Sequence, residues 1–305
     1  MSHINIPDHR TEIEPLWTNA KGLSWREQLV KLAFAATVWL ILLAGAAVML
    51  IPLFWMISTS LKEHWQVFVY PPEWIPNPVR WDNYYVAWTS QPFSYYLRNT
   101  LITTLIPMVG TVLSSSLVAY AFSRLRWKAR DTLFMICLAT MMLPGQVTMI
   151  PMFVIYKHLG WINTFYPFIV PPFFGGGAFN IFLLRQFFMT IDPGLEEAAE
   201  IDGAGYLRIW WSLIMPLAKP ALTVVAIFEF MGRWKDLMGP VIYLHDSKLW
   251  TLIVGLTRFS MPTIGRPTIQ YQMAATLLVM LPPMLLFFFL QRYFIGGIVF
   301  TGMKE

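Results

Sequence analysis

Residues 32–57 read LAFAATVWLILLAGAAVMLIPLFWMI and contain no charged side chain. A helix needs about 20 apolar residues to cross the roughly 30 Å hydrocarbon core of a bilayer, so this run is long enough to cross. It follows a polar, proline-containing stretch and continues without a small-residue cleavage site. We therefore expect a retained membrane span and not a cleaved signal peptide.

The composition of the whole chain also indicates a membrane protein. Of its 305 residues, 56% are hydrophobic and 13% are charged, whereas a soluble domain averages about 25% charged residues. The net charge of +5 comes from basic residues scattered near span ends, which does not indicate a nucleic-acid partner. The single cysteine, Cys137, excludes an intrachain disulfide and a cysteine-built metal site.

Six membrane spans can be placed along the chain. We expect them at about 32–57, 98–122, 132–156, 167–189, 219–244 and 268–293. Several contain proline or glycine, as at Pro144-Gly145, and such breaks persist in a span only where neighbouring helices, waters or a cavity satisfy the backbone. The predicted fold class is an all-α integral membrane protein, with a tail at 1–31 and a six-span domain at 32–305 packed around a pathway.

The distribution of basic residues predicts the orientation of these spans. With the amino terminus inside, eleven Lys and Arg residues from position 21 onward lie in the inner segments or at the inner ends of spans, and six lie in the outer segments. The strongest indication is the short segment SRLRWKAR at 123–130. Because cytoplasmic loops carry an excess of Lys and Arg, we expect both termini, and the loop at 190–220, in the cytoplasm.

That loop contains the stretch EEAAEIDGAGYLRIWWSLIMP at 196–216. Asp192 followed by Pro193 favours the start of a helix, and acids are favourable near its amino end. Gly203 and Gly205 allow a turn, so we expect two short helices joined at a glycine turn. The small residues and the clustered acids favour a docking surface for a cytoplasmic partner; an interfacial loop without a partner is the alternative.

The spacing within this stretch resembles the EAA signature of bacterial ABC importer permeases. That signature has Glu-Ala-Ala, three residues, Gly, nine residues and then Ile-x-Leu-Pro, and here Leu213 and Met215 are apolar replacements within the last part. The resemblance implies a type I ABC importer permease fold in which a cytoplasmic coupling helix contacts an ATPase. The implied coupling residues are Glu197, Ala198, Ala199, Asp202, Gly203, Leu213 and Pro216.

The wider chain, over roughly 30–305, is similar to the carbohydrate-importing branch of these binding-protein-dependent systems, the maltose and glycerol-phosphate type. Segments around Trp210-Trp211, 180–188 and 291–294 contribute to this resemblance. It implies a homologous second permease subunit, two ATP-binding cassette ATPase subunits and an extracytoplasmic solute-binding protein, within the lipid of a bacterial inner membrane. No cofactor is expected on this chain, and ATP and Mg would be used by the ATPase subunits.

Polar residues within the predicted spans are candidates for the substrate pathway, because charges inside a membrane tend to face the bundle interior or water. The chain has Trp234-Lys235-Asp236-Leu237 where the branch usually has Trp-Asn-Asp-Phe, which adds charge to the fifth span. An alternative role for Lys235 and Asp236 is pairing or snorkelling at the outer end of that span. The candidate pathway residues are Gln146, Asn180, Glu229, Trp234, Lys235 and Asp236.

The sequence contains no nucleophile–base pair and no phosphate loop, because Gly175–Gly177 lacks the Gly-Lys-Ser/Thr ending. ATP hydrolysis is therefore expected on a partner chain, and this chain is expected not to be an enzyme. We predict a permease subunit that forms half of a translocation pathway, for a sugar or sugar derivative that the sequence does not name. The alternatives are an integral membrane enzyme and a membrane scaffold without transport.

Overall fold

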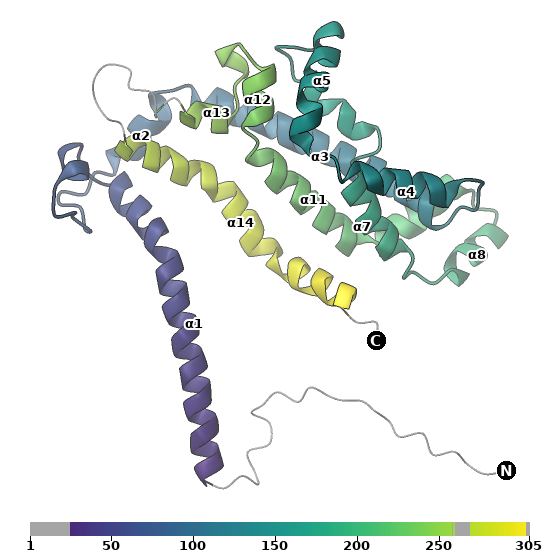
Figure 1. The fold of residues 1–305 in the computed structure, drawn as a ribbon, viewed down its shortest axis with the longest axis horizontal. Helices are drawn as coiled ribbons and strands as arrows, with labels where there is room; N and C mark the ends of the chain where they lie inside the picture. The colour runs from purple at the N-terminus through teal and green to yellow at the C-terminus, as the bar shows by residue number, and fades with distance from the viewer. Residues whose placement is uncertain (1–24, 258, 260–268, 303–305) are drawn as a thin grey trace. The chain divides into compact units, whose positions relative to one another are not determined.

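The computed structural model describes residues 25–257, 259 and 269–302, and every regular element in these ranges is a helix (Figure 1). The all-α class predicted from the sequence is confirmed. The chain divides into two compact units, Met1–Trp55 and Met56–Glu305, and each is described by itself. Predictions for residues 1–24, which form most of the expected tail, lie outside the described residues.

The described part of the first unit belongs to α1 (Trp25–Ser60), which continues into the second unit. Its start at Trp25 lies within the stretch predicted as tail. The second unit continues with η1 (Trp65–Phe68), α2 (Asp82–Thr89), α3 (Phe93–Ser123), α4 (Arg130–Thr140), α5 (Gly145–His158), α6 (Tyr166–Ile169), η2 (Pro171–Phe173) and α7 (Ala178–Phe188). It then forms α8 (Gly194–Ile201), α9 (Tyr206–Ile209), the π-helical η3 (Trp210–Ile214), α10 (Met215–Leu217), α11 (Lys219–Trp234), α12 (Met238–Tyr243), η4 (Ser247–Leu249), α13 (Leu252–Thr257) and α14 (Ile269–Gly302).

Four helical stretches are long and apolar enough to cross a membrane. These are Gln28–Ser60, Phe93–Ser123, Tyr166–Phe188 and Ile269–Gln291. Two further pairs meet the same criteria together: α4 with α5, bent by 98°, and Tyr206–Leu217 with α11, bent by 82°. Counting each bent pair as one crossing gives up to six spans among the described residues, the number expected from the sequence.

Helix α11 ends at Trp234, before the end of the span expected at 219–244. Asp236 explains this break, because its Oδ1 atom accepts a hydrogen bond from the Gly239 backbone N–H at 3.1 Å. Pro240 has no N–H to donate to a helix that continues through this point. The span predicted at about 219–244 therefore consists of two helices, and the break places Asp236 between α11 and α12.

Helix α3 packs against both α7 and α11 (Figure 1). Its fully buried side chains include the small residues Ser115, Ser116 and Ala119. Small residues allow the backbones of membrane helices to approach closely. Helix α14 packs against α2 and α11, so α11 lies between α3 and α14 and contacts both. This arrangement brings polar residues of α3, α7 and α11 together.

Candidate functional site

Helix α8 starts where Asp192-Pro193 predicts a helix. The Asp192 Oδ1 atom accepts a hydrogen bond from the Gly194 N–H at 3.0 Å, which satisfies one donor that a helix N-terminus leaves free. Glu196 and Glu197 lie in the first turn, where the helix dipole favours negative charge. Both acids therefore stabilise the helix, and Glu197 is in addition exposed.

The carboxyl end of α8 is a left-handed glycine turn. Gly203 has a φ of +82°, which favours glycine. The Ala204 N–H donates to the Ala199 carbonyl and the Gly203 N–H donates to the Glu200 carbonyl, each at 2.9 Å. These two bonds form a Schellman motif. The expected helix, glycine turn and second helix are all present in the structure.

The second helix, Tyr206–Leu217, connects this turn to α11. Ile209 and Ile214 are fully buried in the core beside α3 and α7. Ala218, also fully buried, donates its N–H to the Ile214 carbonyl at 2.9 Å, and the chain then bends by 82° into α11. Both sides of the bend are packed, so a helix and not a loose loop connects the glycine turn to α11.

The residues predicted to couple to an ATPase fall into two groups. Glu197, Ala198, Asp202, Gly203 and Pro216 are exposed, whereas Ala199 and Leu213 are partly buried and pack against the core. The neighbouring Ile201 side chain is 87% exposed. The predicted coupling face is thus accessible on α8, and the other two residues anchor it to the membrane helices.

A buried ion pair fixes α8 to the end of α3. Arg124, the residue after α3, places its Nε atom 2.8 Å from Oε1 of Glu196, and its guanidinium also donates to the backbone carbonyls of Phe188 and Ile191. The Tyr120 hydroxyl lies 3.5 Å from the same carboxylate. Burial raises the pKa of Glu196, and the Arg124 charge opposes this rise. One side chain thus joins α3, the end of α7 and α8.

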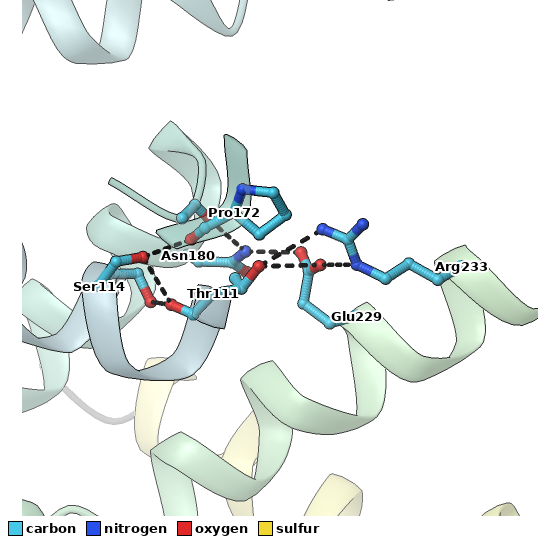
Figure 2. Close-up of polar contacts among 8 residues, drawn as sticks. Thr111, Ser114, Pro172, Asn180, Glu229 and Arg233 are labelled. Atoms are coloured by element: carbon cyan, nitrogen blue, oxygen red, sulfur yellow. Dashed lines mark hydrogen bonds and ion pairs between the residues drawn. The ribbon is translucent and has the colours of Figure 1, made fainter. Parts of the chain in front are cut away.

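A second polar cluster lies within the helix bundle, and Figure 2 shows its side chains converging from three helices. On α11, the Arg233 Nε atom donates to Glu229 Oε2 at 2.8 Å. From α7, the Asn180 Nδ2 atom donates to the other Glu229 oxygen at 2.8 Å. The Thr111 hydroxyl of α3 donates to Glu229 Oε2 at 3.3 Å and accepts from Arg233 at 3.4 Å. A charged pair in a membrane is thereby compensated.

Glycine residues before α7 allow this cluster to assemble. Gly176 has a φ of +65°, and a Cβ there would lie 2.6 Å from the Thr111 carbonyl oxygen. The Asn180 Nδ2 atom donates to the Gly176 carbonyl at 2.8 Å, and the Ser114 hydroxyl of α3 donates to the Pro172 carbonyl at 2.7 Å (Figure 2). The glycine-rich break therefore packs directly on α3 and orients Asn180 toward Glu229.

A cavity of about 480 Å³ borders the cluster. Its walls come from α5, the α6–η2 segment, the glycine-rich break, α11 and α12, with Thr111 contributed by α3. This volume is within the range of about 300–1,000 Å³ typical of small-molecule sites. Glu229, Arg233 and Asp236 supply its charged groups.

The structure brings only some of the predicted pathway residues together. Glu229 and Asp236 line the cavity, and Asn180 binds Glu229 beside it. Gln146 and Lys235 are exposed and do not line it. Trp234 is 3% exposed and donates its indole N–H to the Val279 carbonyl of α14 at 3.0 Å, a geometry that favours a packing role.

Sequence reasoning did not select three residues that organise these sites. Arg124 was counted only toward orientation, although the first arginine after a long apolar span, in a chain whose next loop has adjacent glutamates, was a usable signal. Thr111 had no signal, because threonine is common in membrane helices. Gly239 leaves room for the Asp236 carboxylate, because a Cβ at position 239 would lie 2.6 Å from its Oδ2 atom. Only the structure reveals this contact.

Comparison with known proteins identifies the family. Residues 110–298 match the model of the binding-protein-dependent transport system inner membrane component. The chain is a member of this family. The permease is 32% identical to the sn-glycerol-3-phosphate transport system permease protein UgpE of Yersinia pestis over 267 residues, which cover 85% of this chain and 94% of the relative.

Two further relatives and one solved structure agree with this assignment. The permease is 30% identical to the probable ABC transporter permease protein YurM of Bacillus subtilis, with 88% of each chain covered. It is 26% identical to the diacetylchitobiose uptake system permease protein NgcG of Streptomyces coelicolor, with 87% of each chain covered. A solved bacterial ABC transporter that imports the acidic polysaccharide alginate matches with a TM-score of 0.76 at 24% identity, over 89% of this chain and 99% of that one, which shows a shared fold.

The permease is thus the transmembrane subunit of a binding-protein-dependent ABC importer and an inner-membrane component. The prediction of a transporter subunit is confirmed. Family membership also argues against the alternatives of a membrane enzyme and a scaffold without transport.

Proposed function

We propose that the permease imports a carbohydrate or carbohydrate derivative, and that α8 couples this transport to ATP hydrolysis on partner subunits. Relatives named for sn-glycerol-3-phosphate and diacetylchitobiose support the substrate class. The assembly would contain a homologous second permease, two ATPase subunits that use ATP and Mg, and an extracytoplasmic solute-binding protein. This chain would supply half of the pathway.

One observation carries the coupling role. The exposed face of α8, with Glu197 and Ala198, is joined by packed helix through Ile214 and Ala218 to α11, and α11 bears the Glu229 cluster beside the cavity. An ATPase that binds this face and moves would therefore displace the helix that lines the proposed pathway. The exposed Glu197 carboxylate offers a charge to a basic residue of the ATPase.

Two matched pairs of substitutions test the coupling. In the purified importer, we expect Glu197→Ala to lower binding-protein-stimulated ATPase activity and uptake by about tenfold, the loss typical of one well-placed charged contact. Glu200→Ala, an exposed acid on the same helix outside the signature, is the control. Gly203→Ala forces a side chain into a φ of +82°, whereas Gly205→Ala meets nothing within 4 Å at an ordinary φ. Normal activity of Glu197→Ala and Gly203→Ala would refute the coupling role.

Labelling of single cysteines tests the proposed orientation, in which both termini and α8 face the cytoplasm. The chain has one native cysteine, so Cys137→Ser gives a cysteine-free background. A cysteine at exposed Asp202 should resist a membrane-impermeant maleimide in intact spheroplasts, whereas one at exposed Lys248 should react. Reaction of the cysteine at 202 and protection of the one at 248 would show that the protein has the opposite orientation.

A further inference from the structure

The cavity beside α11 has a charge balance that discriminates between neutral and anionic solutes. Its lining includes one guanidinium, from Arg233, and two carboxylates, from Glu229 and Asp236. The effect of these groups on a solute depends on which of the charges are already compensated by protein contacts.

The Arg233 charge is compensated within the protein. Its Nε atom binds Glu229 Oε2 at 2.8 Å, and one of its terminal nitrogens donates to Thr111 at 3.4 Å. Glu229 is fixed from the opposite side by Asn180. Arg233 can therefore donate a further hydrogen bond into the cavity, but it does not present an uncompensated positive charge that would attract a phosphate or carboxylate group.

Asp236 adds a negative charge with no matching cation. Among the described residues, no lysine or arginine forms an ion pair with it. Its Oδ1 atom accepts from the Gly239 N–H at 3.1 Å. An added Cβ at Gly239 would lie 2.6 Å from its Oδ2 atom and 3.0 Å from the Phe168 ring. The absence of a side chain at 239 therefore makes room for this carboxylate on the cavity wall.

The rest of the lining combines hydroxyl groups with apolar surface. Thr148 donates its hydroxyl to the Gly145 carbonyl at 2.9 Å, which leaves the oxygen able to accept. Tyr156 and Tyr243 lie edge to face with ring centroids 5.3 Å apart. Met152 and Phe174 add apolar surface. Acceptor carboxylates, guanidinium and phenol donors and apolar walls complement a molecule with many hydroxyls and an apolar face.

We infer that this cavity is a binding subsite for a neutral sugar or polyol, and that Asp236 excludes phosphorylated and acidic sugars from it. The inference rests on the proposed carbohydrate import and narrows its substrate class. Hydroxyl groups of the solute donate to Asp236 and Glu229, and one solute oxygen accepts from Arg233. An anionic solute would place a second negative charge close to Asp236, and the repulsion between the two like charges would oppose its binding.

Binding of defined probes to the purified importer, without binding protein or nucleotide, tests this selectivity. Equilibrium dialysis with radiolabelled maltose, sorbitol and glucose 6-phosphate would give three dissociation constants. We expect glucose 6-phosphate to bind about tenfold more weakly than maltose, the effect of one nearby like charge. In Asp236→Asn, which keeps an acceptor for the Gly239 N–H, we expect glucose 6-phosphate to bind about tenfold more tightly and maltose to change less than about threefold.

The matched control is Asp246→Asn. Asp246 is also an aspartate that accepts a backbone N–H, from Lys248 at 2.9 Å, but it is exposed and outside the cavity lining. Its substitution should leave all three constants unchanged, which separates a local charge from the net charge of the importer.

Three outcomes would overturn the inference. The first is tighter binding of glucose 6-phosphate than of maltose and sorbitol. The second is a ratio of the glucose 6-phosphate and maltose dissociation constants that is the same in Asp236→Asn as in the wild type. The third is no binding of either neutral probe. Failure of the proposed function would have a different readout. In that case, proteoliposomes containing the complete importer and its binding protein would show no ATP-driven uptake of any carbohydrate, whatever the dialysis constants.

Discussion

The Arg124 guanidinium at the end of α3 and the Glu196 carboxylate of α8 form an ion pair with 2.8 Å between Nε and Oε1, and each side chain is only 11% exposed. The same guanidinium binds backbone carbonyls at the end of α7. The predicted coupling helix is therefore attached to two helices of the bundle through one side chain. Its inner face is thus fixed to the bundle, whereas its outer face, with Glu197 and Ala198, is exposed.

Substitution of Arg124 and substitution of Glu196 should reduce the stability of the protein by different amounts. Arg124→Ala leaves a buried carboxylate and two carbonyls without their donor, and we expect a loss of about 3 kcal/mol in stability. Glu196→Gln keeps the shape and should cost less, because burial already favours the uncharged form. Heating the importer with a thiol-reactive dye would measure this, since Cys137 is the only thiol of the chain and packs against the same core; the other subunits would be cysteine-free. A larger loss for Glu196→Gln would contradict the geometry.

The ion pair also predicts a dependence of stability on pH. Burial raises the pKa of Glu196 above its ordinary value of 4.5, and Arg124 only partly opposes this. A carboxyl whose pKa is higher in the folded state binds more protons there, so its contribution is fully present below about pH 4.5 and is lost as pH rises through the raised pKa. Between wild type and Glu196→Gln, the difference in unfolding temperature should therefore change across this window. A difference independent of pH would show that the pKa of Glu196 is not raised.

The sequence predicted the helix–turn–helix of the loop because local signals determine it. Asp192-Pro193 initiates α8, and Gly203 is needed for a φ of +82°. The number of spans was likewise available, since length and hydropathy set it. The break within the span at 219–244 was not predicted, because hydropathy does not reveal that the Asp236 side chain binds the Gly239 N–H and interrupts the helix.

The polar cluster could be predicted only in part. The cost of burying a charge identified Glu229 and Asp236 as candidates, and both line the cavity. The contact of Asn180 with Glu229 joins two residues that are 49 positions apart in the sequence, so no local pattern specifies it. Trp234 is similar in type to residues that stack on sugars, yet it packs against α14. The direction in which a helical residue points depends on packing, which one sequence does not reveal.

The Gly176 position should tolerate no side chain. An alanine there would have a φ of +65° and a Cβ 2.6 Å from the Thr111 carbonyl oxygen, a clash with backbone that cannot easily move. We expect Gly176→Ala to lower stability by about 2 kcal/mol and to reduce uptake, because Asn180 loses its position. Gly232→Ala is the control, since nothing lies within 4 Å of its Cβ and alanine favours a helix by about 1 kcal/mol. Equal unfolding temperatures for the two variants would refute the close packing on α3.

Substitution of Trp234 tests whether this side chain packs between helices or contacts the solute in the pathway. Its indole N–H donates to the Val279 carbonyl at 3.0 Å, and its ring stacks on Phe230 with centroids 5.2 Å apart. Trp234→Phe removes the donor and part of the buried ring, so we expect a loss of about 1–2 kcal/mol in stability. Because the side chain is directed toward α14 and does not line the cavity, the KM for uptake and the preference among solutes should stay unchanged. An altered KM in a variant of normal thermal stability would instead place Trp234 in contact with the solute.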